Sequence, residues 1–472
     1  MTAPAEAQFR TFRDPAGSLT IEADRVVRRV RPGFESSTRE FLASNLRQQW
    51  EQRGDLVPTS IVRDEATGIE LHHPRIWFAT YPWEWTLGQW RAAAELTLKL
   101  QQEAVAAGWI LKDATPLNIL FDRSRPVLVD VLSFERRDPQ SPVWLAYAQF
   151  VRTFLLPLIA HRWLHWPLTA TSSRRDGFEP HEIFTALPRL RRFRPQLLWP
   201  VTLPVLLEAK ADNPESARKA RQMHNDPEIA TSVLLSSAKG LLKQIRRAAP
   251  PPAATAWSKY ESTAQHYTAA EISDKQRFVA AALETASPAS VLDVGANTGT
   301  YSLMAARAGA KVLALEADPA AADRIWQRSI EAALDGKAAA TLRGSVLPVI
   351  ANLAWPTPAY GWENRETHAL LDRMQQKFDM VFMLAVVHHL LLHDQVPMEN
   401  IARLMAKLTR QWLLVEWVPL EDPMFQKLLR GREELYGTIS EAGWQTAIGQ
   451  YFEQLQRQEL SNRRVMLLYK LK

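Results

Sequence analysis

A short apolar run that enters a glycine turn, VLDVGANTGT at 291–300, restricts the fold of this 472-residue chain more than any other segment. A strand that passes through closely spaced glycines into a helical stretch is typical of a doubly wound α/β sheet, in which the turn holds a ligand. The spacing from Gly295 to Gly299 is G-x-N-x-G, whereas dinucleotide sites use G-x-G-x-x-G. Asp293 precedes the turn, and an acid there suits a cationic or hydroxyl-bearing ligand better than a pyrophosphate. A NAD-binding domain or an unrelated glycine turn is the alternative interpretation.

Apolar runs and helical stretches alternate through the rest of the C-terminal half. Continuous apolar strands separated by helices predict a mostly parallel sheet that is covered on both faces. Two runs joined by a Ser-Asn turn close the chain and predict an antiparallel edge. The predicted strands are 290–295, 311–316, 346–353, 378–387, 411–418, 452–460 and 463–471, with helices at 299–309 and 320–333.

Glu316 ends the second predicted strand, where a carboxylate can accept hydrogen bonds from both hydroxyls of a ribose. With this acid and the glycine turn together, residues 257–472 resemble the class I S-adenosylmethionine (SAM)-dependent methyltransferases. The resemblance implies a Rossmann-like domain with a seven-stranded sheet and SAM as the cofactor. It also implies that the glycine turn wraps the methionine moiety and that the second-strand acid binds the ribose. The cofactor residues expected in these two segments are Asp293, Gly295, Ala296, Asn297, Gly299, Glu316 and Ala317.

The resemblance implies further cofactor contacts outside these segments. Asn352, near the end of the third strand, is expected at the adenine, with a plain turn residue as the alternative. Leu384, at the end of the fourth strand, is expected beside the sugar and the methyl group. Tyr267 and Lys275 belong to a lead-in segment that covers the cofactor in this family; for each of them a core or surface role is the alternative.

Three polar residues follow the fourth and fifth strands, where ligands bind in open α/β sheets. His388 and His389 can orient an acceptor or take its proton near neutral pH. Glu416 can bind the acceptor or fix a histidine, and it can equally cap a loop. These three are the candidate catalytic residues, and the pattern contains no metal site.

The methyl acceptor is only partly restricted by the sequence. The segment WPTPAYGW at 355–362 differs from the Asn-Pro-Pro-Tyr motif of amide and adenine N-methylation. The C-terminal half lacks a basic-aromatic stripe, which disfavours nucleic acid. We therefore expect a small-molecule, glycoconjugate or natural-product acceptor, and the sequence does not specify an oligomeric state.

Composition excludes several classes of protein. The chain has no cysteine, so disulfides, iron–sulfur clusters and thiolate nucleophiles are ruled out. The most apolar window, 145–168, is interrupted by Gln, Arg and His and falls short of the ~18 apolar residues of a spanning helix. Together with an N-terminus unlike a signal peptide, this predicts a soluble cytoplasmic protein.

The segment AAPPPAATA at 248–256 predicts a linker, because consecutive prolines fit neither a helix nor a central strand. The preceding residues, 1–247, are expected to form an α+β accessory domain that recognises the acceptor. Its predicted elements are a hairpin at 17–31, a helix at 36–54, strands near 57–63 and 74–80, and a long helix at 86–109, followed by mostly helical chain.

A second motif lies at 109–135, where Asp113, Asn118 and Asp130 have the order D-x4-N followed by an acid at a strand end. This motif resembles the catalytic and metal-binding loops of the protein kinase and aminoglycoside phosphotransferase fold. The departures are Leu111 in place of the usual histidine, no glycine-rich loop, and no lysine before Lys99. Of the early strand residues, only arginines such as Arg28 could stand in for the phosphate-binding lysine. A helix–loop coincidence is the alternative.

Three functions therefore remain open from the sequence. The first is methyl transfer aided by an accessory domain, the second a bifunctional enzyme with a working phosphotransferase, and the third a non-catalytic SAM-binding protein.

The first half also carries the basic run LPRLRRFRPQLLWP at 187–200. Such a run can hold phosphates, meet an acidic membrane surface or be a solvated face.

Overall fold

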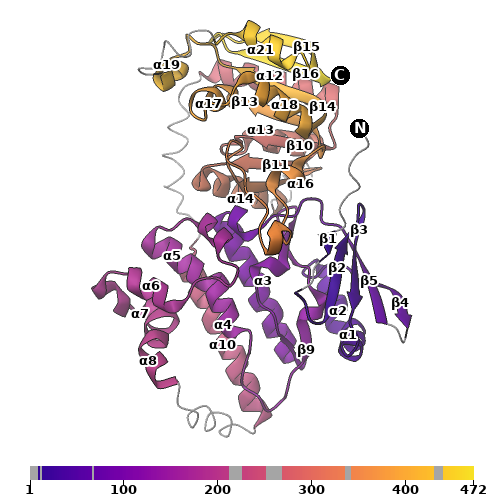
Figure 1. Cartoon of the computed structure of the whole chain (residues 1–472), viewed down its shortest axis with the longest axis vertical. Coiled ribbons are helices and arrows are strands. Elements are labelled where there is room, and N and C mark those ends of the chain that lie inside the picture. Colours follow the sequence, from indigo (N-terminus) through magenta and orange to yellow (C-terminus); the bar gives the residue numbers. More distant parts are fainter. Residues whose placement is uncertain are drawn as a thin grey trace. The chain divides into compact units, whose positions relative to one another are not determined.

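The computed structural model of the chain describes residues 9–10, 13–65, 68–211, 226–250, 268–334, 342–429 and 439–472. The chain divides into two compact units, Met1–Pro251 and Pro252–Lys472 (Figure 1). The boundary falls within the segment expected as a linker, of which 251–256 lie outside the described residues.

The first unit begins with a five-stranded antiparallel sheet of order β1-β2-β3-β5-β4. The predicted hairpin at 17–31 is confirmed as strands β2 and β3. The predicted strand at 74–80 is wrong: β5 begins at Gly68 and ends at Pro74, which has no N–H to continue a ladder. The strands are β1 (Phe9–Arg10), β2 (Gly17–Ile21), β3 (Arg25–Val30), β4 (Ser60–Glu65) and β5 (Gly68–Pro74).

The helix predicted at 36–54 is two helices, α1 (Glu35–Leu42) and α2 (Asn45–Arg53). The break occurs because the Ser44 hydroxyl caps the second helix by accepting the N–H of Arg47. Gly54 ends α2 in the left-handed conformation, as its position in the sequence indicates. The long helix is confirmed as α3 (Leu87–Ala106), which starts with a capping box between Thr86 and Gln89.

Two short strand pairs follow α3 and enclose the D-x4-N motif. Strand β6 (Trp109–Leu111) pairs with β9 (Phe134–Arg136), and β7 (Ile119–Asp122) pairs with β8 (Arg125–Leu128), both antiparallel. The rest of the unit is helical, as expected. Its main helices are α4 (Tyr147–Phe150), α5 (Leu156–Leu164), α6 (Pro180–Ala186), α7 (Pro195–Leu197), α8 (Leu203–Ala211) and α10 (Pro227–Ala248).

The second unit contains a seven-stranded sheet of order β12-β11-β10-β13-β14-β16-β15. The five strands from β12 to β14 are parallel, and the closing hairpin β15–β16 adds an antiparallel edge. All seven predicted strands are present, within a few residues of their predicted bounds. They are β10 (Ser290–Val294), β11 (Lys311–Glu316), β12 (Ser345–Ile350), β13 (Phe378–Leu384), β14 (Thr409–Trp417), β15 (Phe452–Glu459) and β16 (Val465–Leu471).

Helices pack against this sheet and bury its apolar side chains. Val291, Val312 and Phe382 from three strands share one core cluster with Leu303 and Ile325 from the helices. The outer strand β15 is mostly exposed and polar, which protects the edge from pairing with another chain. The main helices are α12 (Ala269–Ala286), α13 (Thr300–Ala308), α14 (Pro319–Leu334), α17 (Val387–Leu392), α18 (Met398–Leu408), α19 (Pro423–Leu429) and α21 (Glu441–Ile448).

Candidate active site

The strand order of the second unit reverses between β10 and β13. From β10 the chain proceeds to β11 and then β12 on one side, whereas β13 and β14 lie on the other side. In open α/β sheets, ligands bind beyond the carboxyl ends of the strands at such a reversal. The turn after β10 and the residues after β13 are therefore the expected place for a site.

Three residues of the glycine turn adopt left-handed backbone conformations, with φ of +66° at Gly295, +51° at Asn297 and +79° at Gly299. A Cβ at Gly295 would lie 2.8 Å from Cγ2 of Val386, which follows β13. A Cβ at Gly299 would lie 3.1 Å from the side chain of Ile325. Both glycines are thus required by conformation and by space, and the first close approach joins the two loops at the reversal.

The turn is fixed to β11 by backbone and side-chain hydrogen bonds. The N–H groups of Gly295 and Ala296 donate to the carbonyl of Leu315 at 2.8 and 3.1 Å. Arg328 also donates to the carbonyl of Thr298 at 2.7 Å, a contact that no sequence pattern indicated. The backbone that would wrap a ligand is therefore held in place before any ligand binds.

The Glu316 carboxylate accepts backbone hydrogen bonds from both sides. Oε2 accepts the N–H of Asn297 at 2.7 Å, and Oε1 accepts the N–H of Asp318 at 2.9 Å. Burial raises the pKa of this carboxyl, and the N–H groups of Asp318, Asn297 and Ala317 oppose that shift. Each oxygen retains acceptor capacity for a hydroxyl, so the pair fits a diol at the edge of the glycine turn.

Asp293 is almost fully buried and does not line an open surface. Its Oδ2 accepts the hydroxyl of Ser302 at 2.5 Å, which ties β10 to the first turn of α13. Burial raises the pKa of Asp293 to about 7. This placement favours a role in shaping the turn over the direct cofactor contact that the sequence suggested.

Glu416 is completely buried, and its neighbours are cationic. Oε2 lies 2.5 Å from Lys275 Nζ of α12, and Oε1 lies 3.4 Å from Arg464. Arg464 also pairs with Asp422 at 2.8 Å. Sequence reasoning assigned Lys275 to the cofactor and Glu416 to the acceptor. Their pairing favours a structural role for both, because it clamps the lead-in helix to β14.

His388 and His389 lie in the first turn of α17, directly after β13. Their ring centroids are 4.2 Å apart, but only His389 is exposed. His388 stacks near Phe425, and its Nδ1 has no hydrogen-bond partner among the described residues. Burial lowers the pKa of His388 to about 3, so this ring is neutral at physiological pH.

The buried neutral His388 predicts a pH-dependent stability. The unfolded chain takes up a proton near pH 6.5, whereas the folded protein does not, so stability falls as the pH drops from 7 towards 3. His388 should contribute about 2 kcal/mol of this loss between pH 7 and pH 5. Urea unfolding of wild type and His388→Gln at both pH values measures the difference. An equal pH dependence in the two proteins would contradict the buried neutral ring.

The remaining predicted residues are spread more widely. Leu384 ends β13 and is buried, beside the left-handed Ala385 at the strand reversal. Asn352 is exposed beyond β12, and its Oδ1 accepts the N–H of Ala354 at 2.8 Å, as a turn residue does. Tyr267 lies outside the described residues.

The D-x4-N motif of the first unit forms one connected cluster. Asp113 accepts the Asn118 amide at 3.0 Å and the Gln149 amide at 2.6 Å. Asn118 also contacts Ser133 at 3.4 Å, and the Ser133 hydroxyl donates to Asp130. Burial raises the pKa of Asp113. The three predicted residues therefore come together, and Gln149 and Ser133 are partners that the motif did not reveal.

Arg28 of β3, the candidate replacement for the phosphate-binding lysine, is the cation that contacts this cluster. Its guanidinium lies 2.7 Å from Asp130 and 3.3 Å from Asp14, and the side chain is nearly buried. Within the described residues, no group of three or more His, Cys, Asp or Glu side chains could hold a metal ion. Asp130, which together with Asn118 would hold magnesium in the phosphotransferases that the motif resembles, is paired here with Arg28.

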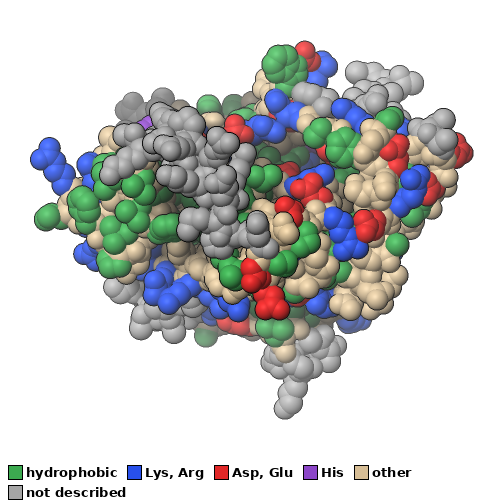
Figure 2. Space-filling view, turned by 90° about the horizontal axis from the view of Figure 1, so that it is seen from below, with side chains coloured by type: hydrophobic (Ala, Val, Ile, Leu, Met, Phe, Trp, Pro, Cys, Tyr) green, Lys and Arg blue, Asp and Glu red, His purple; other side chains and the backbone are tan. Residues whose placement is uncertain are grey.

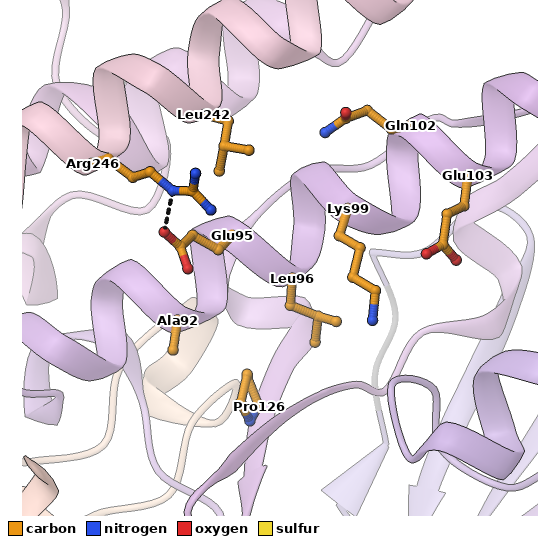
Figure 3. Close-up of a pocket in the computed structure, with 9 residues that line it drawn as sticks. All are labelled: Ala92, Glu95, Leu96, Lys99, Gln102, Glu103, Pro126, Leu242 and Arg246. Atoms are coloured by element: carbon orange, nitrogen blue, oxygen red, sulfur yellow. Dashed lines mark hydrogen bonds and ion pairs between the residues drawn. The ribbon is translucent and has the colours of Figure 1, made fainter. Parts of the chain in front are cut away.

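A groove of about 560 Å³ between α3 and α10 is a further cavity of the first unit (Figure 3). Its charged side chains are already paired: Glu95 binds Arg246 at 2.9 Å, and Lys99 binds Asp55 at 2.7 Å. Lys99, the first lysine of the chain, therefore pairs with Asp55, whereas Asp130 pairs with Arg28. None of the predicted site residues lines this groove.

In the described part of the chain, no helix has the length and the apolar composition needed to span a lipid bilayer.

Comparison with known proteins adds the following similarities. No protein-family model matches the chain. The chain is 29% identical over 460 residues to nodulation protein NoeA of Rhizobium meliloti (strain 1021), across 93% of this chain and 90% of that protein. The alignment thus extends over both units.

Three solved methyltransferase structures are among those that resemble the chain. Magnesium protoporphyrin IX methyltransferase from Synechocystis PCC 6803 with bound SAM is 18% identical, with a TM-score of 0.29 over 43% of this chain and 80% of that one. The N-methyltransferase NodS from Bradyrhizobium japonicum WM9, bound to S-adenosyl-L-homocysteine, is 12% identical, with a TM-score of 0.30 over 45% and 97%. The bifunctional kinase-methyltransferase WbdD is 16% identical, with a TM-score of 0.28 over 44% and 40%.

Proposed function

We propose that the second unit transfers a methyl group from SAM to a small-molecule or glycoconjugate acceptor. The observation that carries the proposal is the geometry at the strand reversal, where the glycine turn after β10 meets the Glu316 carboxylate of β11. The sheet of five parallel strands with a closing antiparallel hairpin supports the mostly parallel seven-stranded fold that the resemblance implies. The 2.7 Å bond from Asn297 to Glu316 joins the two cofactor segments into one site.

Different residues of this site would bind different parts of the cofactor. The turn from Gly295 to Gly299, which is exposed at Gly295 and Asn297, would hold the amino-acid part, and Glu316 would accept the ribose hydroxyls. SAM supplies an activated methyl group, so the protein mainly aligns the acceptor and excludes water. Leu384 and Ala385, at the end of β13, supply apolar surface next to the turn.

His389 is the stronger candidate of the two histidines for contact with the acceptor. It is exposed directly after β13, whereas His388 is buried against Phe425. Its pKa is lowered, first by desolvation and then by the neighbouring His393, so its neutral form can accept a proton near pH 7. We assign His389 the role of orienting or deprotonating the acceptor and His388 that of packing α17.

Two measurements test the proposed function. Calorimetry of the full chain with SAM and with S-adenosyl-L-homocysteine should give saturable binding of both. Incubation with methyl-labelled SAM and a panel of glycoconjugate and small-molecule acceptors should transfer label to at least one of them. Binding without transfer to any acceptor would favour a SAM-binding protein without catalysis, and absence of binding would overturn the proposal.

The first unit, residues 1–247, is proposed as an accessory domain that recognises the acceptor, joined by the linker at 248–256 to the methyltransferase domain at 257–472. Its antiparallel sheet, long helix α3 and Asp113–Asn118–Asp130 cluster resemble the kinase-like layout. The Arg28–Asp130 ion pair at 2.7 Å supports an inactive relative of that fold rather than a second enzyme.

The first unit is therefore expected not to transfer phosphate. A nearly buried guanidinium already neutralises Asp130, so magnesium would have to displace it. Full-length protein with radiolabelled ATP and magnesium should show neither hydrolysis nor autophosphorylation above background. Phosphate transfer that is lost in Asp130→Asn, yet retained when the exposed Asp138 is changed to Asn, would establish the bifunctional enzyme instead.

A further inference from the structure

Residues 187–207 of the first unit, here termed the arginine segment, expose apolar and basic side chains together. The segment contains four arginines and no acidic residue. Five large apolar side chains on it are unusually exposed for a folded domain. They are Leu190 at 92%, Phe193 at 59%, Trp199 at 59%, Leu206 at 52% and Leu207 at 49%. Figure 2 shows hydrophobic side chains gathered beside Lys and Arg on its left part, the side on which Figure 1 shows α6, α7 and α8.

The backbone of the arginine segment is held firmly although its surface is open. The Arg192 guanidinium donates to the carbonyls of Leu187 and Thr185 at 3.0 and 3.1 Å and lies over the ring of Phe184. The Thr202 hydroxyl donates to the carbonyl of Arg192. These contacts fix the turn that carries Arg189, Leu190 and Arg191, all three of which are exposed.

An apolar groove of about 330 Å³ continues this surface. Val151, Leu203 and Leu207 line it, together with the Trp199 ring, whose Nε1 donates to the Tyr147 hydroxyl at 2.9 Å. A tryptophan with an anchored N–H and an exposed ring is suited to the boundary between water and an apolar phase. The groove, at whose lining Arg152 and Glu179 form an ion pair at 2.9 Å, thus adds apolar surface to the exposed side chains of the arginine segment through Trp199 and Leu207.

We propose that the arginine segment seats the protein on the surface of a membrane that contains anionic phospholipids. Basic residues beside exposed leucines and aromatics match the headgroup region, where arginines meet phosphates and apolar side chains enter the acyl boundary. A second copy of this chain would bring the arginines against like charges, and no acid of the segment could offset them. The surface lies in the first unit, so the inference stands independently of methyl transfer in the second.

Vesicle sedimentation of the full-length protein tests this inference. The protein should bind vesicles of phosphatidylcholine with 30% phosphatidylglycerol and bind poorly to pure phosphatidylcholine. Binding should weaken strongly between 0.05 and 0.5 M salt, because the arginine contribution is screened. The double variant Arg189→Gln/Arg191→Gln should bind anionic vesicles roughly 30-fold more weakly, at about fivefold for each arginine.

Matched variants test whether binding depends on this surface or on any exposed leucine or arginine of the chain. Leu190→Ser should weaken binding roughly tenfold through lost apolar contact, whereas Leu334→Ser, 79% exposed in the second unit, should not. Arg277→Gln/Arg365→Gln removes two exposed arginines elsewhere with the same change in net charge and should retain binding. Because Leu190 and Arg191 contact mainly solvent, their variants are expected to fold normally.

Four results would overturn the proposal. The first is absence of binding to anionic vesicles at 0.05 M salt. The second is binding that is unchanged in Leu190→Ser and in the Arg189/Arg191 double variant. The third is a dimer by analytical ultracentrifugation that Leu190→Ser converts to a monomer, which would make the face an interface between copies. Retention on a poly-glutamate column without vesicle binding would likewise assign the face to an acidic protein partner.

Discussion

Replacing Glu316 by alanine is expected to weaken SAM binding by about 1.5–3 kcal/mol, a factor of roughly 10 to 150. The carboxylate would lose its charge-assisted hydrogen bonds to the ribose. It would also release the N–H of Asn297, which it accepts at 2.7 Å, and so loosen the glycine turn. Calorimetry with SAM and with S-adenosyl-L-homocysteine measures the change, and both ligands should lose similar affinity because they share the ribose.

Two further variants control this experiment. Glu316→Gln keeps one acceptor oxygen and should fall between wild type and alanine. Asp318 is the nearest acid, but its Oδ1 accepts the N–H groups of Ala320 and Ala321 and caps α14. Asp318→Ala should therefore lower the melting temperature while SAM affinity stays close to wild type. Unchanged affinity in Glu316→Ala would remove the ribose role from this residue, whether or not the chain binds SAM elsewhere.

The sheet of the second unit could be predicted because its signals are local. Each of the five parallel strands is a largely apolar run, and the glycines of the turn after β10 lie where a Cβ would approach Val386 and Ile325 closely. The bond between Asn297 and Glu316 follows from the parallel pairing of two adjacent strands. The strand bounds and the position of Glu316 beside the glycine turn could thus be predicted from pattern and spacing, whereas its ribose role stays a prediction.

Contacts between segments that are distant in the sequence could not be predicted. Glu416 was interpreted as a strand-end acid that binds the acceptor, fixes a histidine or caps a loop. In the structure it pairs with Lys275 of α12 and with Arg464, the residue before β16. Nothing in the local sequence of VEWVPL indicates those partners. Likewise, a single histidine pair gave no sign that His388 turns inward and His389 outward, because that depends on how α17 packs. In the first unit the helix break at Ser44 was missed, since serine occurs both inside helices and at caps.

The largest expected effect on stability concerns the buried ion pairs of Glu416 with Lys275 and Arg464. Glu416→Ala should lower the free energy of unfolding of the second unit by about 3–5 kcal/mol. The side chain is fully buried between Lys275 and Arg464, whose own side chains are only 7% and 5% exposed. Removing the carboxylate leaves Lys275 without the anion that lies 2.5 Å from its Nζ, while Arg464 keeps Asp422. Because domains are typically stable by only about 5–15 kcal/mol, the variant should unfold at a much lower urea concentration.

Comparison of Glu416→Ala with two further variants decides between a structural and a catalytic role for Glu416. Glu421→Ala removes an exposed acid five residues along the chain and should leave the urea midpoint close to wild type. Lys275→Met combined with Glu416→Leu replaces the buried pair by apolar side chains and should recover most of the lost stability. If the pair is structural, this double variant also regains methyl transfer per folded molecule, because neither charge is needed in the reaction. A Glu416→Ala protein that unfolds like wild type yet transfers methyl groups 100-fold more slowly would instead place the carboxylate at the acceptor.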